Sequence, residues 1–174
     1  DGGFVLGGST SYGFTGTSDA LIIRLNALGD TLWKRSYGGI NQEFLYDMVA
    51  IPGGGYLASG TTESFGAGGV DYFGFKIDEA GMLEWSKAYG GLQDDYATGV
   101  IQTGGGGFAF IGYTYSFGAG NKELYFVKTD AYGNTSCNTE QVIGNEMTLI
   151  SNCDQDPVTP STSSPSVIAS SIAT

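Results

Sequence analysis

The chain has 174 residues, of which 41% are hydrophobic and 13% are aromatic, and this content excludes a wholly disordered or collagen-like protein. Thirty glycines against four prolines favour many tight turns over long helices. Seven basic and 18 acidic residues give a net charge of -11, so we expect neither nucleic acid nor an anionic membrane surface as a partner. No apolar run approaches the roughly 18 residues of a membrane-spanning helix, so we also expect no membrane insertion.

The sequence repeats itself at an interval of 52 residues. Gly-aromatic pairs end at Phe4, Tyr56 and Phe108, and the other motifs of each unit recur at the same interval without insertions. The chain begins directly inside this motif, and we expect that an upstream segment has been removed. The predicted domain covers residues 1–153, with units of about 1–52, 53–104 and 105–153.

Each unit begins with two candidate strands. The first is a glycine-led apolar stretch, as at 55–62, which ends in a turn rich in Gly and Ser. The second is a nearly continuous apolar run at 20–25, 72–77 and 124–128, which is typical of a strand covered on both faces. We expect this second strand to be the most buried strand of its unit.

Two further strands complete the unit. A hairpin turn with Asn or Asp and then Gly precedes the third strand, at 31–37 and 83–89, in which large and polar residues alternate. The fourth strand, at 46–51 and 97–102, alternates less cleanly, and we expect it to be an outer, more exposed strand that leads into the next unit. Four antiparallel strands in about 50 residues form a propeller blade of the kelch size class.

Three motifs also carry a family resemblance: Gly-Tyr-Thr-Tyr-Ser-Phe-Gly-Ala-Gly at 112–120, Lys-x-Asp-x-x-Gly, and Leu-x-Trp-Ser-Lys-x-Tyr-Gly-Gly. Over residues 1 to about 136 the chain resembles secreted bacterial and archaeal β-propeller repeats. The resemblance implies an exported or cell-surface protein with no assigned catalytic activity.

The predicted fold is therefore all-β, with antiparallel four-stranded blade repeats in a β-propeller-like array of about three blades. Closed propellers have four to eight blades, so the sequence does not predict whether the three blades close into a ring. The third unit breaks off after Cys137, and 146–151 is a candidate for its missing strand. We expect the C-terminal segment or neighbouring chains to complete the sheets.

Two modifications are predicted near the end of the repeats. Cys137 and Cys153 flank a short polar segment, which in an exported protein indicates one disulfide; the alternative is two unrelated buried thiols. Asn134 begins an Asn-Thr-Ser acceptor pattern for N-glycosylation on a turn.

Residues 154–174 form a Ser/Thr/Pro-rich tail, which is typical of a linker or an O-glycosylated stalk. Its last stretch, 166–174, is apolar and β-branched enough to add a strand to the sheet edge of another copy. The predicted subunit contacts there are Val167, Ile168 and Ile172. The alternative is that the tail folds back onto its own domain.

The sequence lacks the residues of common active sites. Histidine is absent, which removes the usual general base and transition-metal ligand. The glycine runs lack the Gly-Lys-Ser/Thr of a phosphate loop, and no calcium-binding loop occurs, so we expect no catalytic residue, no cofactor and no metal. Carboxylates that could in principle serve glycoside hydrolysis are Asp94, Asp95, Glu43, Asp47 and Glu63. We expect Asp71 and Asp78 to cap turns.

Tyrosines offer one further binding chemistry. Tyr37, Tyr89, Tyr113, Tyr115 and Tyr125 have the ring faces that stack on sugars, although at repeat-equivalent positions they are more simply explained as blade core. We therefore expect a non-catalytic extracellular or cell-surface structural protein whose copies assemble into a filament or surface layer. The alternatives are an adhesion or glycan-binding propeller module of a larger secreted protein and, last, an enzyme.

Overall fold

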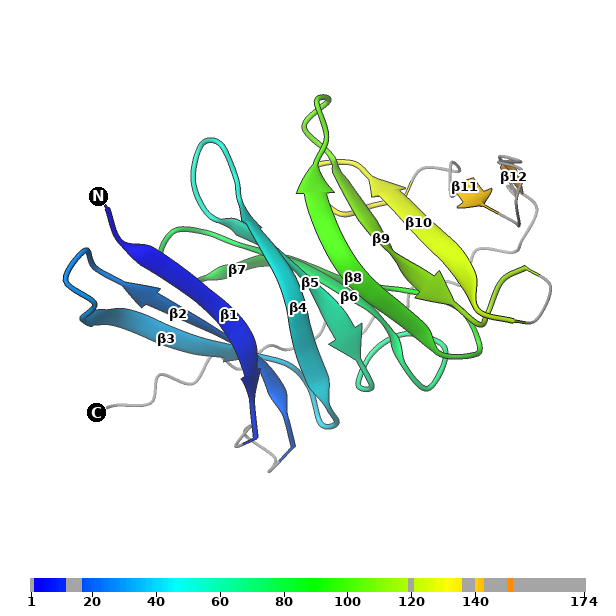
Figure 1. The fold of residues 1–174 in the computed structure, drawn as a ribbon, viewed down its shortest axis with the longest axis horizontal. Coiled ribbons are helices and arrows are strands. Elements are labelled where there is room, and N and C mark those ends of the chain that lie inside the picture. The colour runs from blue at the N-terminus through cyan, green and yellow to red at the C-terminus, as the bar shows by residue number, and fades with distance from the viewer. Residues whose placement is uncertain (1, 12–16, 119–120, 136–139, 143–149, 152–174) are drawn as a thin grey trace.

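A computed structural model describes residues 2–11, 17–118, 121–135, 140–142 and 150–151. In these residues all regular structure is β, arranged as three antiparallel sheets that lie side by side (Figure 1). The prediction of an all-β fold built from antiparallel sheets is confirmed. Within the described residues no helix is long and apolar enough to cross a membrane.

The three sheets follow one another along the chain. The first sheet has the order β1 (Phe4–Thr10), β2 (Asp19–Leu25), β3 (Thr31–Tyr37). The second has the order β4 (Glu43–Ala50), β5 (Tyr56–Thr62), β6 (Asp71–Ile77), β7 (Leu83–Tyr89). The third has the order β12 (Ile150–Ser151), β11 (Glu140–Val142), β10 (Glu123–Thr129), β9 (Phe108–Thr114), β8 (Asp95–Gln102).

The hairpin turns form where the sequence predicts them. After β6, the amide of Met82 donates to Asp78 Oδ1 at 2.7 Å and Gly81 takes a φ of +76°. The equivalent glycines, Gly29 and Gly133, have φ values of +90° and +75°. This left-handed conformation favours glycine, so the recurring Asx-x-x-Gly pattern fixes three identical turns.

The fourth strand of each sequence unit was expected to be an outer, more exposed strand. β4 and β8 do lie at the edge of their sheets, but they are not more exposed than β3 and β7, so the second part of the prediction was wrong. β4 and β8 pair with the strands that follow them, β5 and β9, and so begin the next sheet. They also pack against the preceding sheet, where Leu45 and Ala97 are buried. Both strands contain a bulge, after Leu45 and after Ala97, which brings apolar residues to both faces and obscures the alternation in the sequence.

Burial follows the junctions between sheets. One core lies between the first and second sheets, and another lies between the second and third. The prediction that the second strand is the most buried holds for β6, but β5 is buried to the same extent. β2 and β10 are less buried, because within the described part of the chain each belongs to a sheet with a neighbouring sheet on one face only.

Candidate functional site

The junction between the first and second sheets shows how these sheets attach. Trp33 on β3 donates its Nε1–H to Glu79 O at 3.1 Å, and Tyr37 donates its hydroxyl to Gly81 O at 2.7 Å. Both acceptors belong to the hairpin turn of the next sheet. Burial raises the pKa of Tyr37, which keeps the phenol protonated and able to donate.

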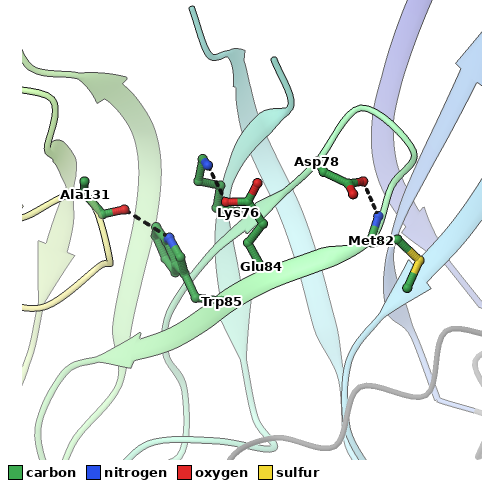
Figure 2. Close-up of polar contacts among 6 residues, drawn as sticks. All are labelled: Lys76, Asp78, Met82, Glu84, Trp85 and Ala131. Atoms are coloured by element: carbon green, nitrogen blue, oxygen red, sulfur yellow. Dashed lines mark hydrogen bonds and ion pairs between the residues drawn. The ribbon is translucent and has the colours of Figure 1, made fainter. Parts of the chain in front are cut away.

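The second junction repeats these contacts 52 residues later. Trp85 on β7 reaches Ala131 O at 3.2 Å, as Figure 2 shows, and Tyr89 reaches Gly133 O at 2.8 Å. The same sequence motif therefore builds the same joint twice. A sheet of this repeat has one face shaped for the preceding sheet and the other shaped for the following sheet.

The outward face of the first sheet has no such partner in the described part of the chain. Phe4 and Leu6 on β1 are 55% and 51% exposed. Of their equivalents in the later sheets, Ala58, Phe108 and Phe110 are buried in the cores, and Tyr56 is partly buried against one of them. The apolar side chains of β1 thus occupy positions that the repeat normally covers.

The edge of the first sheet is also open. β5 lies between β4 and β6, and β9 lies between β8 and β10, whereas β1 has only β2 beside it in the described residues. A strand paired on one side presents unpaired backbone N–H and C=O groups on the other. The first sheet therefore combines an open edge with an open apolar face.

At the opposite end of the array, the third sheet exposes a second apolar face. Ile101 is 60% exposed, and Ile111 and Leu124 are each 44% exposed. The equivalent of Leu124 in the second sheet is Tyr72, which is buried against the third sheet and donates its hydroxyl to Tyr125 O at 3.1 Å. These residues again lie where the following sheet of the repeat would pack.

Three tyrosines gather on the third sheet. Tyr96 stacks on Tyr113 with ring centroids 5.0 Å apart, and Tyr115 meets Tyr113 edge-on at 6.1 Å. Lys122 Nζ lies 3.6 Å from the centroid of Tyr113, and Tyr96 lies beside the carboxylate of Asp94. None of these tyrosines has an aromatic equivalent in both other units, so the cluster is a feature of this sheet.

A pair of buried carboxyl groups lies at the junction of the second and third sheets. Asp71 begins β6 and Asp95 begins β8, and both are 0% exposed. A Cβ built on Gly90 would lie 1.8 Å from Asp71 Oδ1 and 2.5 Å from Asp95 Oδ2. The two oxygens are therefore no farther apart than the sum of these distances, about 4.3 Å, which is within the range of strong repulsion between like charges.

The surroundings of this pair favour a proton on Asp71. Asp95 Oδ2 accepts hydrogen bonds from the Gly91 amide and the Ser116 hydroxyl, each at 2.7 Å. Asp71 Oδ1 is buried without a hydrogen-bond partner in the described residues. Burial first, and then the nearby Asp95 carboxylate, raise the pKa of Asp71 to about 6, although the amide of Gly68 acts in the opposite direction.

The first junction holds a related pair. Asp19 and Glu43 precede Asp71 and Asp95 by 52 residues, and both are buried. The longer Glu43 side chain accepts a hydrogen bond from Thr62 Oγ1 at 2.7 Å.

Asp71 was expected only to cap a turn. Its Oδ2 does accept the Gly68 amide at 3.0 Å, but the sequence analysis did not predict that Asp71 lies close to Asp95. The signal was the recurrence of two acidic positions at the 52-residue interval.

The other predicted residues fall into two groups. Asn134 is exposed on the turn after β10, where its side chain donates to Asp130 Oδ2 at 3.1 Å. Cys137, Cys153, Val167, Ile168 and Ile172 lie outside the described residues, so the disulfide and the subunit contact stay predictions. Of the candidate strand at 146–151, the described part is β12, which pairs with β11.

The carboxylates considered for hydrolysis do not gather in one place among the described residues. Asp47 Oδ2 accepts the amide of Val100 at 2.9 Å and Asp94 Oδ1 accepts that of Val70 at 3.1 Å, so both hold backbone across a junction. Asp78 caps its turn, as predicted. Within the described residues no group of three or more Asp, Glu, Cys or His side chains is placed to hold a metal ion. No family model and no curated protein matches the chain.

Proposed function

We propose that this protein is a non-catalytic extracellular structural protein, with a β-propeller-like array of about three blades, whose copies assemble into a filament or surface layer. The proposal rests on one observation: both ends of the three-sheet array expose an apolar face. Phe4 and Leu6 at one end, and Ile111 and Leu124 at the other, are exposed although their repeat equivalents are covered. A head-to-tail contact between unlike ends produces either a ring or an open polymer.

The location outside the cell is part of the same proposal. A disulfide between Cys137 and Cys153 would persist only in an oxidising compartment. The net charge of -11 suits a surface that repels nonspecific partners while specific apolar contacts form the assembly. Two of the carboxylates considered for hydrolysis, Asp47 and Asp94, accept backbone amides across the junctions, which supports a structural role for them.

Negative-stain electron microscopy of the purified protein at neutral pH tests the proposal. We expect regular fibres or sheets from the full chain, and their loss when residues 157–174 are removed. Dispersed particles from both samples, at concentrations up to the millimolar range, would contradict self-assembly. Non-reducing mass analysis of the same material would show whether the two cysteines form the predicted disulfide.

The tyrosine cluster favours a second function, adhesion through surface glycans. Tyr115 is 36% exposed next to Tyr113 and Tyr96, and Asp94 adds a hydrogen-bond acceptor beside the rings. Exposed aromatic faces with a polar rim suit the apolar faces of sugars. Titration with a panel of neutral oligosaccharides tests this function, and binding that survives Tyr115→Ala would place any glycan elsewhere.

A further inference from the structure

We propose that the open edge of β1 is the acceptor for a donated strand, and that the donor is the C-terminal segment 166–174 of a second copy of this chain. The inference rests on the proposed self-assembly and names the two surfaces that make the contact. It assigns β1 the role of acceptor in the first sheet, where β1 corresponds to β5 and β9, and it places the donated strand beside β1 at the position that β4 and β8 hold in the second and third sheets.

The backbone of β1 supplies the first argument. All seven residues pair with β2, and within the described chain no second strand pairs with residues 4–9, whereas β5 and β9 are paired on both sides. Natural edge strands are usually protected by charged residues, proline or a bulge. β1 reads Phe-Val-Leu-Gly-Gly-Ser-Thr and pairs with β2 in unbroken register, so it has none of these protections.

The side chains supply the second argument. In the second and third sheets the strand at this position covers the neighbouring core with two apolar residues three apart, as Ala97 and Val100 do on β8. The spacing of three arises from the bulge in the strand. The C-terminal segment has Ala169 and Ile172 at the same spacing, with Val167 and Ile168 before them. It contains no charge and no proline after Pro165, so it meets the requirements of an added strand.

The arrangement of the sheets favours a donor from another copy. β1 belongs to the first sheet and β12, the last described strand, belongs to the third, with the whole second sheet between them (Figure 1). To reach its own β1, the segment 166–174 would have to cross the second sheet through the 14 residues that separate it from β12. The next copy in a head-to-tail polymer places a fresh β1 edge at that end.

A pair of matched variants tests the acceptor. Leu6→Glu puts a charge beside the donated strand, and Leu32→Glu makes the same change on β3, at the position that Glu84 occupies in the second sheet. The two leucines are 51% and 56% exposed, so neither change should alter the melting temperature of the monomer appreciably. Analytical ultracentrifugation of the full chain measures assembly, and hydrogen exchange of residues 4–10 reports on the β1 amides.

We expect Leu6→Glu to weaken assembly by about tenfold or more, and Leu32→Glu to assemble as the wild type does. A synthetic peptide of residues 166–174 should dissociate the wild-type polymer and protect the β1 amides, whereas a scrambled peptide should not. If the wild type assembles but neither Leu6→Glu nor the peptide affects it, the acceptor is wrong and the proposed function stands. A wild-type chain that stays monomeric with its β1 amides protected would show that the tail folds back on its own domain, which overturns donation between copies.

Discussion

The buried pair of Asp71 and Asp95 predicts an unusual dependence of stability on pH. The pKa of Asp71 is raised from an ordinary value of 3.8 to about 6, so the folded chain holds this proton more tightly than the unfolded chain does. The corresponding stabilisation is fully present below pH 4 and is lost as the pH rises through 6. A shift of this size corresponds to about 3 kcal/mol, an upper value because buried sites relax.

The substitution Asp71→Asn isolates this effect, because asparagine keeps an acceptor for the Gly68 amide and places a donor opposite Asp95. We expect the variant to be more stable than the wild type at pH 7.5, by up to about 3 kcal/mol or about 10 °C in melting temperature, and nearly equal to it at pH 3.5. Urea unfolding at several pH values, in a buffer with a chelator so that no cation compensates the charge, gives the difference at each pH.

The exposed residue Asp30 provides the control for Asp71→Asn. Asp30→Asn makes the same chemical change at an exposed turn and should alter the free energy of unfolding by less than about 0.5 kcal/mol. A variant of Asp71 that is less stable than the wild type at pH 7.5, or that differs from it equally at every pH, would show that the carboxylate is ionised and satisfied in the native state.

Three further substitutions, the first with a matched control, examine the junctions by thermal and urea unfolding. Gly90→Ala places a methyl group 1.8 Å from a carboxylate oxygen and should lower the free energy of unfolding by more than about 2 kcal/mol. The control Gly104→Ala places its methyl group where no atom lies within 4 Å and should be tolerated. Equal stability of the two variants would contradict the close packing at the carboxyl pair. Tyr89→Phe removes the hydrogen bond to Gly133 O and should cost about 1 kcal/mol, and no loss would mean that water replaces the hydroxyl. Leu57→Ala opens a cavity in the core between the second and third sheets and should cost about 2–5 kcal/mol; a cost below about 1 kcal/mol would indicate that this junction is loose.

The sequence was sufficient for the strands and turns, but not for the way they group into sheets. The period of 52 residues and the Asx-x-x-Gly turns predict the first three strands of the first two units, and the first two strands of the third, close to where they occur. A repeat defines a period, however, and leaves its phase open: a strand at the end of one unit can equally begin the next sheet. The bulges after Leu45 and Ala97 hid the two-sided burial that would have shown β4 and β8 to begin sheets.

Part of the candidate site could be predicted from the sequence. Exposed residues such as Leu6 look like ordinary core in the sequence, because the repeat gives them the pattern of their buried equivalents, and only the sheet order shows that nothing described covers them. The carboxyl pair carried a visible signal in the recurrence of acidic residues at 19 and 71 and at 43 and 95. What the sequence could not supply is that the two positions, 24 residues apart, begin strands of adjacent sheets.

The position of the carboxyl pairs connects stability with assembly. Each pair joins β2 or β6 to the first strand of the next sheet, β4 or β8, so it forms only where two sheets of the repeat meet. The proposed donor segment has no Asp or Glu side chain, and at the edge of β1 the described chain has no preceding sheet to supply a partner for one. An acidic strand would bring an unpaired charge to that edge. An uncharged donor therefore fits β1 better than a copy of β4 or β8 would, and assembly through it should vary less with pH than the stability of the junctions does.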